Sequence, residues 1–142
     1  MRPIFTLILA LLTMPAFAAD TVCSLKDQYW ISSALPRLKT WKAIHESFQK
    51  FTPQCDDGFI GEGYTEAVVV LLSHHWSSLP GLAALVRGDT KFEKFILRHI
   101  NASADADDLK QLLTQSEKQC PPKHKAICLS IHSATNSAIK EL

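Results

Sequence analysis

Carboxylates and glycines are concentrated between residues 55 and 63, in the order Cys-Asp-Asp-Gly-Phe-Ile-Gly-Glu-Gly. Asp56, Asp57 and Glu62 carry the groups of a calcium site or of a general acid–base pair. The alternating oxygen ligands of an EF-hand are absent, and Asp and Gly in such a segment commonly cap backbone N–H groups and supply positive φ. Local structural roles are therefore favoured. Because binding residues concentrate in conspicuous loops on rigid scaffolds, this segment is also the predicted binding surface. The predicted binding residues are Asp56, Asp57, Gly58 and Glu62.

Histidines provide an enzymatic alternative. His74 and His75 end a predicted helix, and together with the carboxylates of residues 56–62 they would suit a small hydrolase or a metal-dependent enzyme. The same pair is explained by the favourable position of partial positive charge at a helix C-terminus. His99 has the spacing of a buried helix face. The sequence contains no nucleophile elbow, phosphate loop or dinucleotide fingerprint, so we predict neither a catalytic residue nor a cofactor.

Cysteines and histidines also alternate near the C-terminus. Cys120, His124, Cys128 and His132 recur at four-residue steps, and both residue types bind zinc. On one straight helix this ladder would extend about 18 Å, which is too far for a single ion to bridge. An oxidising compartment also favours disulfides over thiolate ligands. We therefore predict disulfides and no metal.

Four cysteines allow three pairings, and the sequence alone does not choose among them. Proximity along the chain favours Cys23–Cys55 and Cys120–Cys128. On one continuous helix, the second pair would lie about 12 Å apart, whereas a disulfide needs Cα atoms within about 7 Å. This bond therefore requires the two prolines that follow Cys120 to reverse the chain.

Helical periodicity dominates the elements that must position these residues. The segment around residues 24–33 is ambiguous between helix and extended structure, and residues 55–63 are expected to form a loop. The helix from about Tyr64 to Trp76 is apolar nearly all round, which predicts a central position. A capping box predicts another helix start at Thr90. The predicted helices begin at Pro36, Tyr64, Leu82, Thr90, after Ser103 or Asp105, and just beyond Pro122. We predict an all-α fold, a single irregular bundle of five to six helices held by disulfides.

Residues 1–18 have the layout of a secretory signal peptide. Arg2 precedes a short apolar stretch that ends in Ala16-Phe17-Ala18, a typical cleavage site. The stretch is too short, and too interrupted by a proline, to span a bilayer. We therefore predict cleavage after residue 18 and a single helical domain over residues 19–142. This domain is expected to be secreted or periplasmic, with no integral membrane segment.

The charge balance limits the classes of partner. The net charge is +1, and removal of Arg2 with the signal peptide brings it to zero. No Lys/Arg stripe is present, so we predict no nucleic-acid partner. In its layout of leader, helical domain and two disulfides, the chain resembles small secreted bacterial proteins, among them some periplasmic immunity proteins that neutralise cell-wall-degrading toxins. This layout and the missing catalytic motif favour a non-enzymatic protein-binding module, inhibitor-like or immunity-like, with a protein partner. The small hydrolase or metal-dependent enzyme remains the alternative.

Overall fold

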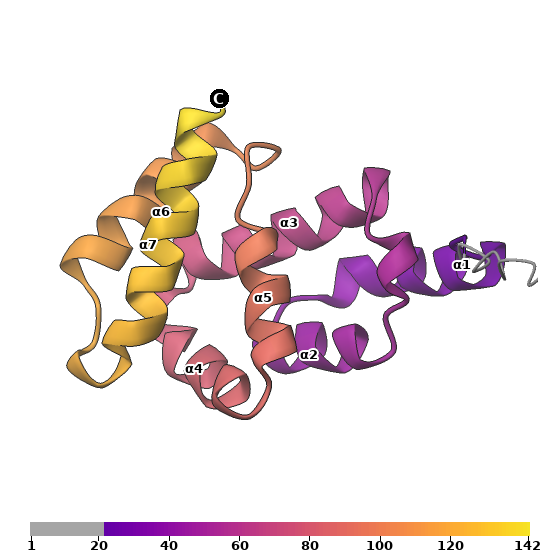
Figure 1. Ribbon diagram of the computed structural model, residues 1–142, viewed down its shortest axis with the longest axis horizontal. Coiled ribbons are helices and arrows are strands. Elements are labelled where there is room, and N and C mark those ends of the chain that lie inside the picture. The colour runs from indigo at the N-terminus through magenta and orange to yellow at the C-terminus, as the bar shows by residue number, and fades with distance from the viewer. Residues whose placement is uncertain (1–21) are drawn as a thin grey trace, which may run out of the picture.

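The computed structural model describes residues 22–142, so the predicted signal peptide at residues 1–18 lies outside the described residues. Within them the chain forms seven α-helices and no strand, which confirms the predicted all-α fold (Figure 1). The additional helix comes from the ambiguous N-terminal segment. The helices are α1 (Leu25–Ala34), α2 (Trp41–Gln49), α3 (Gly58–His74), α4 (Leu79–Gly88), α5 (Thr90–Arg98), α6 (Ala106–Lys118) and α7 (Lys125–Lys140). Short 3-10 turns occur at η1 (Leu35–Arg37), η2 (Pro53–Cys55), η3 (Trp76–Ser78) and η4 (Pro122–His124).

Helix α3 forms the centre of the bundle, as its apolar sequence predicts. Its side chains Tyr64, Val68 and Leu72 are fully buried and belong to one continuous core with residues of the surrounding helices. Helices α6 and α7 pack together at one end of the molecule, while α1 lies at the opposite end (Figure 1). A helix that is apolar on most faces is stable in this position because neighbours cover it on several sides.

The start of α3 corrects the predicted loop. Helix α3 begins at Gly58, so most of the glycine-rich segment is helical. Asp57 accepts a hydrogen bond from the Gly58 N–H at 2.7 Å, and Gly58 has a φ of 51°. A Cβ added at Gly63 would lie 2.6 Å from Cδ1 of Leu35 in η1. This glycine therefore permits the close approach of η1 to a helix, where the sequence had indicated a loop.

The helix start predicted at Pro36 is also displaced. Pro36 lies in the η1 turn, and α2 begins only at Trp41, because Thr40 is the residue whose hydroxyl accepts the Ala43 N–H at 3.1 Å. Thr40 has the extended backbone of an N-cap residue, which places the first helical residue at Trp41.

The predicted capping box at Thr90 is wrong by one residue. Asp89 caps α5, and its carboxylate accepts the N–H of Phe92 at 3.0 Å. Asp105, one of the two predicted caps for the next helix, does cap α6 and accepts two backbone N–H groups of its first turn. An aspartate at an N-cap also interacts favourably with the positive end of the helix dipole.

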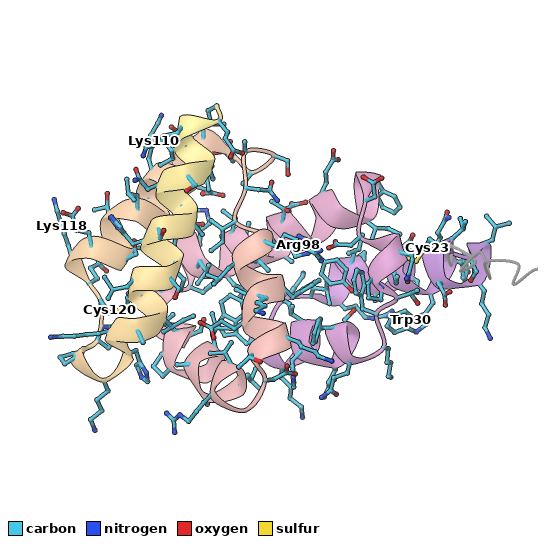
Figure 2. The ribbon with its side chains drawn as sticks, in the orientation of Figure 1. Cys23, Trp30, Arg98, Lys110, Lys118 and Cys120 are labelled. Carbon is cyan, nitrogen blue, oxygen red and sulfur yellow. A yellow bond between two sulfur atoms is a disulfide. The ribbon has the colours of Figure 1, made fainter. Side chains whose placement is uncertain are left out.

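Both predicted disulfides are confirmed. The Cα atoms of Cys23 and Cys55 lie 4.8 Å apart, and those of Cys120 and Cys128 lie 6.0 Å apart. The η4 turn supplies the chain reversal that the second bond requires. Figure 2 shows Cys23 at the α1 end of the molecule and Cys120 at the α6–α7 end, so the two bonds brace opposite ends.

The arrangement of side chains and helices over residues 22–142 bears on metal binding and on membrane insertion. In that part of the chain, no three histidine, cysteine, aspartate or glutamate side chains come together in a group that could hold a metal ion. None of its helices is by itself long and apolar enough to cross a membrane. The segments 58–74 and 76–88 reach the necessary length and hydropathy only when taken together, and they are bent by 97° at their junction.

Candidate functional site

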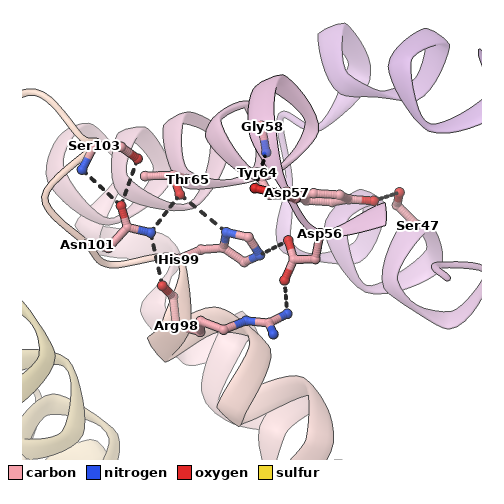
Figure 3. Close-up of polar contacts among 10 residues, drawn as sticks. All are labelled: Ser47, Asp56, Asp57, Gly58, Tyr64, Thr65, Arg98, His99, Asn101 and Ser103. Carbon is pink, nitrogen blue, oxygen red and sulfur yellow. Dashed lines mark hydrogen bonds and ion pairs between the residues drawn. The ribbon is translucent and has the colours of Figure 1, made fainter. Parts of the chain in front are cut away.

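Asp56 points into the protein instead of toward solvent. Its side chain is 5% exposed, and one carboxylate oxygen forms an ion pair with Arg98, the last residue of α5 (Figure 3). The other oxygen lies 3.2 Å from Nε2 of His99. Neither that oxygen nor Nε2 has an aligned hydrogen-bond partner, so their contact is electrostatic. Asp56 therefore joins the segment that precedes α3 to the C-terminal end of α5.

His99 is a buried, neutral imidazole. Its Nδ1 lies 3.3 Å from the hydroxyl of Thr65, which accepts a hydrogen bond from the Asn101 side-chain amide at 3.1 Å. Because the Thr65 oxygen already accepts from Asn101, its own hydrogen is available to the unprotonated Nδ1. The pKa of His99 is lowered to about 4, chiefly by burial and also by the neighbouring Arg98 charge, while a contact with the Gly61 backbone acts in the opposite direction. With Arg98 already balancing Asp56, a proton on His99 would add an uncompensated buried charge.

The Asp56–His99–Thr65 arrangement contains a carboxylate, an imidazole and a hydroxyl in series, as acid–base sites do. The geometry of this protein directs them inward. The side chain of His99 is 4% exposed, and Thr65 is 1% exposed. All three residues contribute to the lining of a shallow pocket with a volume of about 310 Å³. Their nearly complete burial places these groups to hold the segment before α3 against the C-terminal end of α5.

The other predicted binding residues have different environments. Asp57 caps α3, and Gly58 supplies the positive φ at its start, as the structural interpretation of the sequence expects. Glu62 is exposed and faces both the shallow pocket and a larger groove beside it. Of the four residues, Glu62 therefore has the side chain with the clearest access to a partner.

The structure does not bring His74 to the carboxylates of residues 56–62. His74 ends the 17-residue helix α3, and such a helix is about 25 Å long. Nε2 of His74 lies 2.7 Å from Oδ1 of Asp108 at the start of α6. The histidine that does approach the segment is His99, which the sequence had indicated only as a core residue.

A groove of about 790 Å³, here called the α3 groove, lies beside the shallow pocket and shares Glu62 and Ser103 with it. Three segments form it: η1 with the residues after it, the exposed side of α3, and the chain that leads into α6. Its apolar lining consists of Leu35, Pro36, Leu38, Phe59, Gly63, Ala67, Val69, Val70 and Ala104. Its polar lining consists of Lys39, Glu62, Glu66, Ser103, Asp105 and Asp108. Sequence reasoning found only the edge that carries Glu62, because the other walls come from distant parts of the chain.

Comparisons with models of protein families, with curated proteins and with solved structures find no match to this chain.

Proposed function

We propose that this protein is an exported, non-enzymatic binding module that captures a protein partner in the α3 groove, as an inhibitor or immunity-like protein does. The observation that carries the proposal is the groove itself. It has a mainly apolar lining and a few polar groups at its edge, a composition typical of binding clefts. Phe59 stands at its mouth with 61% of its surface exposed. Exposed aromatic side chains are typical anchors of protein interfaces.

The walls of the groove are braced by interactions that do not involve a ligand. The Cys23–Cys55 disulfide fixes the segment just before α3, and the Asp56–Arg98 ion pair ties the same segment to α5. Gly63 allows η1 to pack directly against α3. A preformed site loses little conformational freedom on binding, so a partner's binding energy is not consumed in ordering it.

Export is supported by the sequence and the disulfides together. Residues 1–18 have the composition of a signal peptide, and both cysteine pairs are positioned to form disulfides. Disulfides persist in oxidising compartments and are rare in the reducing cytosol. The burial of His99, whose side chain is 4% exposed, favours binding over the hydrolase alternative, since so little of the ring is open to a substrate.

Site-specific photo-crosslinking in cells of the source organism tests the proposal. A photoreactive phenylalanine analogue is placed at Phe59 at the mouth of the groove, and in a matched control at Leu129, which is 70% exposed on α7. We expect an adduct with one defined protein from position 59 that position 129 does not give. The same set of adducts from both positions, or no adduct from position 59, would contradict a partner site in the groove.

A further inference from the structure

We infer that the segment captured in the α3 groove is cationic and amphipathic, with an apolar side chain that enters the groove and lysine or arginine residues that reach its rim. This inference rests on the proposed function and adds the chemistry of the partner. It follows from the contrast between the apolar lining of the groove and the charges around it.

The floor of the groove requires an apolar ligand group. Ala67 and Val70 are only partly buried by the protein's own side chains, and Phe59 is largely exposed beside them. Water in contact with these groups would be released by an inserted apolar side chain, and the gain grows with the area covered. A purely polar or highly charged peptide would leave this area unused.

The rim carries four carboxylates, and two of them have local roles. Asp105 accepts two backbone N–H groups as the cap of α6, and Asp108 lies 2.7 Å from Nε2 of His74. Within residues 22–142, no ion pair involves Glu62 or Glu66, and both are exposed. Lys39 is the only basic residue that lines the groove in this part of the chain.

Glu62 and Glu66 lie one turn apart on α3, where like charges repel each other. A cation placed between them removes that repulsion and gains an ion pair with each carboxylate. The interaction is possible without moving the backbone, because both side chains already face the groove. Negative potential beside an apolar surface attracts a basic partner and rejects an acidic one of the same hydrophobicity.

Two labelled peptides test this chemistry by fluorescence anisotropy with the full mature chain. One has a Leu-Leu-Trp centre flanked by lysines, and the other has glutamates in place of every lysine. We expect the lysine peptide to bind at least about tenfold more tightly, and its affinity to fall as salt is added. The double variant Glu62→Gln, Glu66→Gln is expected to weaken binding of the lysine peptide about fivefold, which is the effect of two exposed ion pairs.

Matched variants separate charge from hydrophobic contact. Glu117→Gln with Glu141→Gln removes the same number of exposed carboxylates away from the groove and should leave the affinity unchanged. Phe59→Ala should also weaken binding, whereas Leu129→Ala should not. Circular dichroism confirms that each variant is folded.

The outcomes distinguish this inference from the proposed function. If position 59 crosslinks a partner but both peptides bind equally, or the groove and distant charge variants behave alike, a cationic ligand is excluded while the binding function stands. A specific adduct between two copies of this chain would identify a second copy as the occupant and overturn the inference. Absence of any specific adduct at position 59 would remove the proposed function itself.

Discussion

Acidification is expected to destabilise the protein through His99. In the unfolded chain this imidazole has an ordinary pKa of 6.5, whereas burial in the folded protein lowers its pKa to about 4. Between these values the unfolded state binds a proton that the native state does not, so the free energy of unfolding rises with pH. The contribution of His99 is fully present above about pH 6.5 and is lost as the pH falls toward about 4.

The size of this loss of stability follows from the difference between the two pKa values of His99. Each pKa unit corresponds to about 1.4 kcal/mol. The free energy of unfolding should therefore fall by about 3 kcal/mol when the pH is lowered from above 6.5 to below about 4. The assay is urea unfolding followed by circular dichroism at several pH values above about 4.5, a range in which ordinary carboxylates remain mostly ionised. The free energy of unfolding should decrease steadily as the pH is lowered through this range.

A variant without the titrating group isolates the effect. The amide of His99→Gln offers a donor and an acceptor but does not titrate, so its stability should depend much less on pH than that of the wild type. His74→Gln, at a half-exposed histidine, serves as the matched control and should keep the dependence due to His99. If the stability of the wild type and of His99→Gln depends equally on pH, His99 is not the group responsible. The same conclusion would follow from an NMR titration in which the wild-type His99 ring takes up its proton near pH 6.5, a measurement that needs no variant.

Three further predictions concern the support of the groove and its neighbouring helix. Removal of the disulfide with Cys23→Ala and Cys55→Ala should cost about 4 kcal/mol in guanidinium unfolding, because the bond closes a separation of 32 residues; an unchanged midpoint would contradict this. Asp89→Ala should lower the free energy of unfolding by about 1 to 2 kcal/mol, whereas Asp89→Asn should retain most of the cap. Equal losses of stability for the two variants in thermal unfolding would show that the loss does not come from the capping hydrogen bond. Gly63→Ala should lower the melting temperature because its Cβ would overlap the side chain of Leu35, whereas Gly88→Ala, with open space around it, should not. An unchanged or higher melting temperature for Gly63→Ala would show that the Leu35 side chain moves aside without cost.

Features that depend on neighbouring residues could be predicted from the sequence. The pairing of Cys120 with Cys128 required only that a proline turn reverse the chain between them, and η4 does so. The central position of α3 followed from apolar residues on most of its faces. In both cases the information lies within one short segment.

Features that depend on tertiary contact could not be predicted in this way. Gly63 is a glycine because Leu35 approaches it from a distant segment, so its presence in a helix contradicts the local loop signal. Asp89 and Thr90 are both good caps by type. The choice between them coincides with a contact across the fold, since the Asp89 carboxylate also lies 3.1 Å from Nε2 of His45 in α2. Tertiary context overrides local preference at each of these positions.

The same distinction between local and tertiary features applies to the residues of the candidate site. The sequence indicated the segment that contains Glu62 by its unusual composition. It did not indicate the inward direction of Asp56, because the attraction of Arg98 and the proximity of His99 arise only when α5 packs beside α3. The α3 groove was equally inaccessible to sequence reasoning, since its walls come from three separate parts of the chain.

The most direct measurement is the identity of the peptide that crosslinks to a photoreactive group at position 59. Mass spectrometry of the digested adduct locates that peptide in the partner's sequence. We expect an apolar residue with lysine or arginine close on either side, from a different protein. An acidic peptide, or a peptide from this chain itself, would show that the groove does not bind a cationic segment of a partner.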